Sequence, residues 1–213
     1  MIYFDNAAST KTAPEAAEAM QRFFGEEYAN PAGSSTASAG ARHAVEEARE
    51  SVAALIGAYA DEIVFTSGGT ESNNTAVFAM PGASEVICSA IEHPSVIRCV
   101  EALHRSGTRT KLIPCPRGIA DTSALEAGMS GLSADPVRLR PESAESAGDA
   151  AASRSCRGIV SVMLVNNELG TLQPVAEIAE ISHKAGFMFH TDAVQAAGHF
   201  PVKVHELGAD MLS

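Results

Sequence analysis

The chain has 213 residues and 46% of them are hydrophobic, so it is long and apolar enough to build a substantial buried core. A formal net charge of −11 with scattered Lys and Arg residues forms no basic stripe, which argues against a nucleic acid partner. No apolar run approaches the roughly 18 to 20 residues of a membrane span, and the N-terminus has no leader pattern. We therefore expect a cytoplasmic protein with no membrane partner.

The cysteines and histidines give no metal-ligand pattern. Cys88, Cys99, Cys115 and Cys156 are widely spaced and form no Cys-x-x-Cys pair, so neither a zinc site nor a disulfide framework is indicated. We expect all four thiols to be reduced and structural, and we expect no metal.

The first part of the chain has two segments with apolar residues at helical spacing, 13–24 and 41–56. Ile63–Thr66 is a short apolar run and predicts a buried strand. A Gly68-Gly69-Thr70 turn then leads into another helix.

Strand and helix patterns alternate from there on. Strands are expected at residues 85–90, 111–115, 159–165 and 187–190. Between them, one helix is capped by Ser95 and ends at Gly107, a short one starts at Asp121 or Thr122, and one runs from Pro174 to Gly186. This alternation predicts an α/β fold, a mostly parallel sheet with helices on both faces.

Residues 133–157 interrupt the pattern. The segment is rich in Ser, Ala, Glu and Arg, contains two prolines and has no apolar periodicity. We interpret it as a disordered insertion within one domain that covers residues 1–213.

Polar clusters follow four of the expected strands. They are Ser67–Asn73, Glu92–Pro94, Asn166–Glu168 and Asp192–Gln195. Because ligands of open α/β sheets bind outside the carboxyl ends of the strands, the clusters predict one shared site.

The Gly68-Gly69-Thr70 turn suits an anion, since glycines allow close approach and a helix N-terminus offers free N–H groups. The alternative is a simple turn. Neither a P-loop nor a G-x-G-x-x-G pattern is present, so a nucleotide site is disfavoured.

Asp192 and His93 each allow a structural and a functional interpretation. Asp192 follows an apolar strand, where it either caps a helix or pairs with a cationic ring nitrogen, and Gln195 would face the same space. His93 precedes Pro94 and is either a structural histidine or a catalytic one that stacks on a planar ring and exchanges protons.

Taken in order, the clusters resemble the class V aminotransferase family of fold-type I pyridoxal-phosphate (PLP) enzymes, most closely its cysteine desulfurases. The resemblance rests on residues 3–10, Asn30-Pro31, and residues 62–73, 92–93, 165–170 and 192–195. It covers nearly the whole chain apart from residues 133–157. The fold implied is the large domain of a PLP-dependent transferase, in incomplete form.

The resemblance also implies a role for each candidate residue. Gly69 and Thr70 would hold the cofactor phosphate, His93 would stack on the ring, and Asp192 would pair with the ring nitrogen. Asn167 and Gln195 would approach the phenolic oxygen. By family chemistry, L-cysteine gives its sulfur to an enzyme cysteine thiolate, as a persulfide for iron–sulfur cluster or thio-cofactor assembly, and L-alanine is released.

The family's cofactor lysine, in a Ser-x-His-Lys motif, and its sulfur-accepting cysteine have no counterpart here, and no histidine follows Asn30-Pro31 closely. We therefore expect the isolated chain to be inactive and the complete enzyme to be a homodimer that serves a sulfur-acceptor or scaffold protein. The alternatives are another class V enzyme, such as a selenocysteine lyase or an aminotransferase, and a non-catalytic remnant that keeps the fold.

Overall fold

The computed structural model describes residues 2–79, 85–129, 137–138 and 155–213. The chain divides into two compact units, Met1–Val64 and Phe65–Ser213. Most of the insertion predicted at residues 133–157 lies outside the described residues. Its described parts include a short antiparallel pair, β3 (Val137–Arg138) and β4 (Ser155–Cys156). The assignment of residues 1–213 to a single domain stays a prediction.

The first unit is helical. It contains α1 (Pro14–Gly25), α2 (Thr36–Ile56) and the short η1 (Ala60–Glu62), so both expected helices are confirmed. The longer helix begins where the Ser35 hydroxyl accepts a hydrogen bond from the backbone N–H of Ser38. It ends at Gly57, whose left-handed φ of 69° suits glycine.

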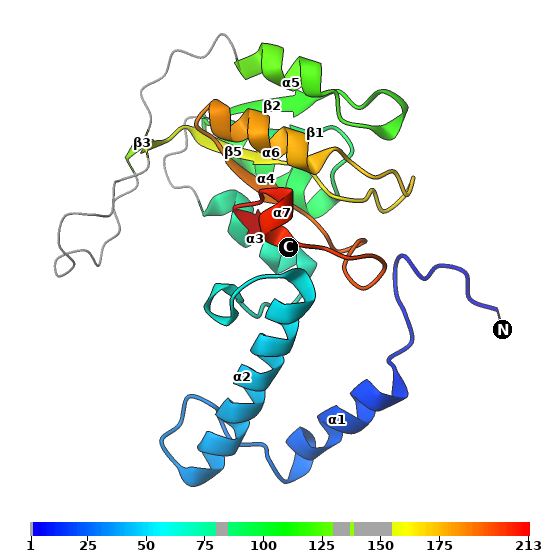
Figure 1. The fold of residues 1–213 in the computed structure, drawn as a ribbon, viewed down its shortest axis with the longest axis vertical. Helices are drawn as coiled ribbons and strands as arrows, with labels where there is room; N and C mark the ends of the chain where they lie inside the picture. Colours follow the sequence, from blue (N-terminus) through cyan, green and yellow to red (C-terminus); the bar gives the residue numbers. More distant parts are fainter. Residues whose placement is uncertain (1, 80–84, 130–136, 139–154) are drawn as a thin grey trace. The chain divides into compact units, whose positions relative to one another are not determined.

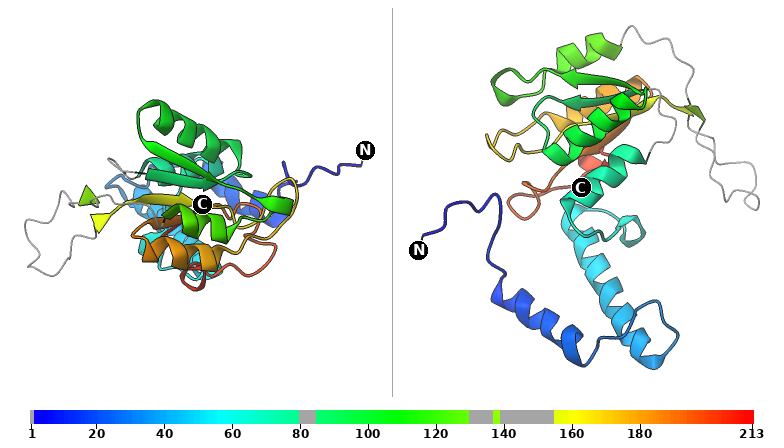
Figure 2. Two further views of the ribbon diagram at one scale, coloured as in Figure 1. Left: turned by 90° about the horizontal axis from the view of Figure 1, so that it is seen from above. Right: turned by 180° about the vertical axis from the view of Figure 1, so that it is seen from behind.

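The second unit is built on a five-stranded parallel sheet of order β2-β1-β5-β6-β7. The strands are β1 (Glu85–Ser89), β2 (Arg109–Ile113), β5 (Gly158–Ser161), β6 (Met188–Thr191) and β7 (Met211–Leu212). The helical segments of this unit are α3 (Gly69–Phe78), α4 (Pro94–Arg105), η2 (Pro116–Gly118), α5 (Thr122–Met129), α6 (Val175–Lys184) and α7 (Val204–Leu207). Figures 1 and 2 show helices on both faces, as predicted.

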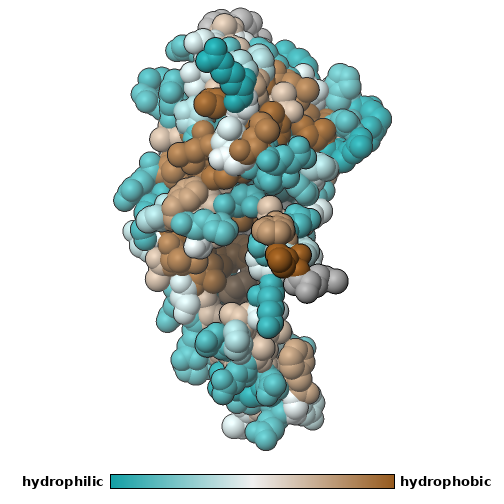
Figure 3. Space-filling model, turned by 90° about the vertical axis from the view of Figure 1, so that its right-hand side faces the viewer, coloured by the Kyte–Doolittle hydropathy of each residue, from teal (hydrophilic) through white to brown (hydrophobic). Residues whose placement is uncertain are grey.

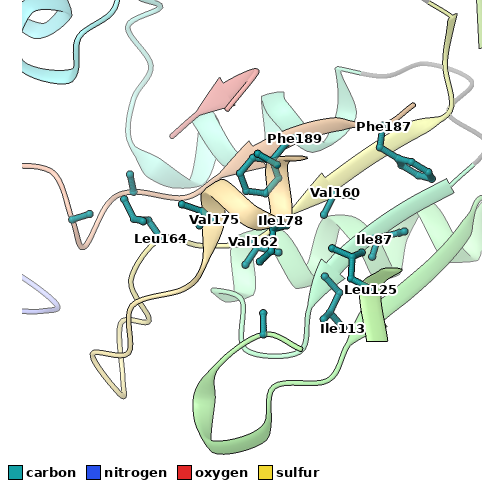
Figure 4. Close-up of a cluster of buried hydrophobic side chains, with 14 of the residues drawn as sticks. Ile87, Ile113, Leu125, Val160, Val162, Leu164, Val175, Ile178, Phe187 and Phe189 are labelled. Atoms are coloured by element: carbon teal, nitrogen blue, oxygen red, sulfur yellow. The ribbon is translucent and has the colours of Figure 1, made fainter. Parts of the chain in front are cut away.

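Alternate residues of the strands face opposite helix layers. Ile87, Val160 and Phe189 pack with Leu125 of α5 and Ile178 of α6, as Figure 4 shows. The opposite cluster joins the sheet to α3 and α4 through Val77, Val86, Cys88, Val96, Val100 and Ile159. Each strand of the central three is thus buried on both faces, which explains its continuous hydrophobicity.

The predicted central strand Ile63–Thr66 is wrong. In the described part of the chain these residues follow η1 and form no strand, and 77% of Val64 and 49% of Phe65 are exposed. The boundary between the two units also falls within the segment. An apolar run predicts that side chains favour burial, but a strand also needs a neighbour for its N–H and C=O groups, and the run does not specify that neighbour.

Apolar side chains interrupt the polar surface of the second unit in the upper part of Figure 3. Over the whole described part of the second unit, the large exposed apolar residues are Phe65, Phe78, Leu112, Ile119, Leu169, Leu172, Val194 and Phe200. They come from several different elements, and scattered exposed apolar residues are common in folded proteins. No helix in the described part of the chain is long and apolar enough to cross a membrane.

Candidate cofactor site

The polar clusters after β1, β5 and β6 lie at one edge of the sheet, because these parallel strands are neighbours. Two hydrogen bonds join the segments beyond the strand ends. The backbone N–H of Leu164 donates to the carbonyl oxygen of Asp192 at 2.8 Å, and the Asn166 amide donates to the carbonyl oxygen of Ile91 at 2.9 Å. Three of the four predicted clusters therefore follow strands at one edge of the sheet, whereas Ser67–Asn73 follows a segment that forms no strand.

Asp192 is buried directly after β6. Its Oδ1 accepts from the backbone N–H of Val194 at 3.0 Å, and its Oδ2 accepts from the side-chain Nδ2 of Asn73 at 2.7 Å. A turn, not a helix, follows it. The carboxylate thus stabilises that turn and is also held by an amide from α3.

Gly69 and Thr70 are the first two residues of α3, so amides at this end are not used within the helix. A Cβ atom on Gly69 would come within 2.9 Å of Val194 Cγ2. The glycine allows α3 to begin against the segment that carries Asp192. Thr70 is exposed at the same helix end.

His93 caps α4, a role expected of Ser95 from the sequence. Its ring Nδ1 accepts a hydrogen bond from the backbone N–H of Ser95 at 3.1 Å and lies 2.7 Å from the Ser95 hydroxyl. Pro94 then occupies the first helical position, which has no use for an N–H. The imidazole is half-buried.

Asn73 and Ser95 connect the two principal candidates, a role that was not predicted from the sequence for either residue. Asn73 Nδ2 lies 2.7 Å from Asp192 Oδ2 and 2.9 Å from Ser95 Oγ, while Ser95 Oγ contacts His93. The signal was available, since Asn73 shares the buried face of α3 with Ala76 and Val77. A buried amide needs hydrogen-bond partners.

Asn167 and Gln195 are half-buried near the same edge. In the loop after β5, Asn166 shapes the backbone, because its Oδ1 accepts from the N–H groups of Glu168 and Leu169 at 3.0 and 2.7 Å. Gln195 lies in the turn that follows Asp192. Their approach to a cofactor oxygen stays a prediction.

Glu92 is a buried carboxyl group beside His93. Its Oε1 accepts from the Ser89 hydroxyl and from the backbone N–H of Met163, the latter at 2.9 Å. Burial raises the pKa of Glu92 to about 8, and the nearby charge of Asp192 contributes in the same direction. No group of three or more metal-ligating side chains gathers anywhere in the described ranges.

Comparison with known proteins gives a consistent result. The model of the class-V aminotransferase family matches residues 2–134 and 146–213. The chain is 38% identical over 218 residues to cysteine desulfurase IscS of Dictyoglomus turgidum, and 39% identical over 219 residues to a cysteine desulfurase of Sinorhizobium fredii. A solved structure described as SspA in complex with cysteine superposes with a TM-score of 0.81 at 31% identity.

These matches cover all, or nearly all, of this chain but only part of its relatives. The alignments include 100% of this chain and 49% and 50% of the two desulfurases, and the superposition includes 99% of this chain and 56% of the other. The chain thus spans about half the length of the curated relatives it matches. With its parallel sheet and its shared polar edge, the chain belongs to the aminotransferase class-V family.

Proposed function

We propose that the sheet edge around Asp192 binds pyridoxal 5'-phosphate. Gly69 and Thr70 would hold the phosphate at the start of α3, and His93 would stack on the ring. Asp192 would pair with the ring nitrogen. The observation that carries the proposal is the continuous hydrogen-bond chain from Asp192 to His93, which brings an acceptor for a cationic nitrogen and an aromatic ring to one place.

The donor set at this edge fits that cofactor. A carboxylate has about four acceptor positions, and Asp192 receives one N–H on each oxygen, which leaves capacity for a cationic partner. The close approach of Gly69 to Val194 brings the anion-binding end of α3 beside this carboxylate. Asn167 and Gln195 supply amides for the phenolic oxygen.

We further propose that a protein containing this chain is a cysteine desulfurase, which converts L-cysteine to L-alanine and passes the sulfur to an enzyme cysteine. The bound cofactor would supply an electron sink for the substrate's α-carbon. His93 would present its ring to the reacting atoms. The names of the two relatives support this reaction over selenocysteine cleavage or transamination. The covalent lysine and the sulfur-accepting cysteine would complete the site.

The wider assignments follow from the same likeness. We propose a homodimer in the cytoplasm that delivers sulfur to an acceptor or scaffold protein for iron–sulfur cluster assembly. The name of one relative, cysteine desulfurase IscS, supports the role in iron–sulfur cluster assembly.

The test uses the longest in-frame protein that contains these residues. With added PLP and a thiol reductant, L-cysteine should yield alanine and sulfide in equal amounts. Transamination would instead yield a keto acid, and preference for selenocysteine would indicate a lyase of that substrate. A protein that binds PLP but releases no alanine contradicts the desulfurase assignment, and one without PLP absorbance contradicts the cofactor assignment.

A further inference from the structure

Two side chains, those of Asn73 and Ser95, link Asp192 to His93 through the interior of the second unit. Asn73 Nδ2 lies between Asp192 Oδ2, at 2.7 Å, and Ser95 Oγ, at 2.9 Å. Ser95 Oγ in turn lies 2.7 Å from His93 Nδ1. Asn73, Ser95 and Asp192 are all buried, so water does not compete freely for these bonds.

The direction of each bond follows from what each group can donate. A carboxylate only accepts, so the Asn73 NH2 group must face Asp192, and its second N–H points to the Ser95 hydroxyl oxygen. The Ser95 oxygen is then an acceptor from Asn73, and its own hydrogen is left to donate to His93 Nδ1. The backbone N–H of Ser95 donates to the same nitrogen at 3.1 Å.

The same donor and acceptor requirements exclude the opposite orientation of the Asn73 amide. It would place Asn73 Oδ1 against Asp192 Oδ2, two acceptors without a hydrogen between them. The orientation present leaves Asn73 Oδ1 buried without a partner among the described residues. A buried oxygen without a hydrogen bond is unfavourable. The two bonds made by the NH2 group therefore hold the amide in this orientation in spite of the unsatisfied Oδ1.

We propose that Asn73 is a positioning residue: it holds the Asp192 carboxylate and, through the Ser95 hydroxyl, keeps the proton of neutral His93 on Nε2. Nδ1 receives two donors and has no room for a hydrogen of its own. His93 therefore presents an N–H group at Nε2. The meaning of this for catalysis rests on the proposed function, because Nε2 would then be a hydrogen-bond donor beside the cofactor ring.

The test is the tautomeric state of His93 in the 213-residue chain, which NMR measures directly. With 15N-labelled histidine at a pH where the rings are neutral, long-range 1H–15N correlations distinguish the two ring nitrogens. A His93→Gln variant assigns the signal. We expect a protonated Nε2 and an unprotonated Nδ1. A ring that carries its proton on Nδ1 overturns the proposal.

Variants then test the role of Asn73. In Asn73→Ala the Ser95 hydroxyl no longer has to donate to Nδ1, so the Nδ1 signal should shift from its wild-type position although the Ser95 backbone N–H still donates there, and the Val194 amide signal should shift as Asp192 loses a partner. Ser95→Ala, a smaller change, should move the Nδ1 signal because one donor is lost. Thr75→Ala, at an exposed position of the same helix, should leave both signals unchanged.

A merely structural Asn73 gives a different result. It would lower the melting temperature of Asn73→Ala without moving the His93 ring signals, and that outcome overturns the coupling. If Asn73→Ala does not fold, an unmoved Nδ1 signal in Ser95→Ala overturns it equally. The spectra need no cofactor, whereas PLP binding is measured separately by absorbance. Failure of PLP binding therefore counts against the proposed function and leaves the hydrogen-bond network standing.

Discussion

Glu92 Oε1 accepts a hydrogen bond from the backbone N–H of Met163 at 2.9 Å, so one carboxyl group after β1 holds the chain just beyond β5. The same oxygen accepts from Ser89. The other oxygen, Oε2, is buried and has no partner among the described residues. Burial without a cation favours the neutral acid, which is why the pKa of Glu92 rises to about 8.

Stability should fall with rising pH because of Glu92. The folded chain keeps a proton that the unfolded chain releases near the ordinary pKa of 4.5, so the free energy of unfolding decreases between about pH 4.5 and 8. Glu92→Gln keeps an acceptor for Met163 without the charge, and it should flatten this slope and be relatively more stable at pH 8.5. Urea unfolding at pH 5.5, 7 and 8.5 measures this change of the unfolding free energy with pH.

A matched control removes an exposed carboxyl group. Glu177→Gln in the first turn of α6 should leave the slope as in the wild type. If the unfolding free energy of Glu92→Gln changes with pH as that of the wild type does, the Glu92 carboxyl group is ionised in the folded chain and does not carry the proton.

His190 should make the free energy of unfolding depend on pH under acidic conditions. Burial lowers the pKa of His190 to about 4, while the unfolded chain takes up a proton near 6.5, so the free energy of unfolding should fall as the pH drops from about 6.5 to 4. The neutral ring lies between the hydroxyls of Ser161 and Ser213, at 2.9 and 3.0 Å. His190→Asn should reduce this slope, although it lowers stability at pH 7.

The exposed His199 provides the comparison. His199→Asn should retain the wild-type acid slope in the same urea titrations. Equal slopes for His190→Asn and the wild type would assign the acid sensitivity to other groups.

The four cysteines should be poor nucleophiles in the folded chain. None is in a disulfide, and Cys88, Cys99 and Cys156 are buried. Burial raises the pKa values of Cys88, Cys99 and Cys115, which disfavours the reactive thiolates. At pH 7.5 and without urea, a thiol reagent should label Cys115 first and the three buried cysteines slowly. In urea it should label all four fully. Fast labelling of Cys88 or Cys99 in the folded chain would contradict this burial.

Sequence periodicity predicted most of the second unit because burial on both faces leaves a strong pattern. The runs at residues 85–90, 159–165 and 187–190 are apolar since their side chains face helices on either side, and β1, β5 and β6 lie there, although β5 ends at Ser161. Ile63–Thr66 has the same kind of pattern but forms no strand in the described structure. Composition indicates a tendency to be buried, whereas pairing depends on residues far away in the sequence.

The candidate site was predicted less completely, for a related reason. Gly69, His93 and Asp192 stand at strand ends and helix starts, where local signals are strong. Asn73 and Asp192 are 119 positions apart, so their bond at 2.7 Å could not be read from either neighbourhood. The buried position of Asn73 on α3 indicated that it needed a partner but not which one.

Asp192→Asn should affect stability and cofactor binding to different extents. Asp192 accepts one N–H on each oxygen, whereas asparagine has a single acceptor oxygen and would turn its NH2 group toward Val194 or Asn73. Opposed donors should lower the free energy of unfolding by about 1 to 3 kcal/mol. An amide also cannot form the charge-assisted bond to a cationic ring nitrogen, worth about 1.5 to 3 kcal/mol, so PLP affinity should fall at least about 10-fold.

Asp121→Asn is the control that separates these effects, because Asp121 Oδ1 accepts from the Ala124 N–H at the start of α5, among residues given no cofactor role. Aspartate and asparagine cap helices about equally well, so this variant should unfold and bind PLP much as the wild type does. Urea unfolding and absorbance titration with PLP are measured on both variants of the longest in-frame protein. If Asp192→Asn loses stability but keeps wild-type PLP affinity, its carboxylate only holds the turn and Asn73, and the ring nitrogen has another partner.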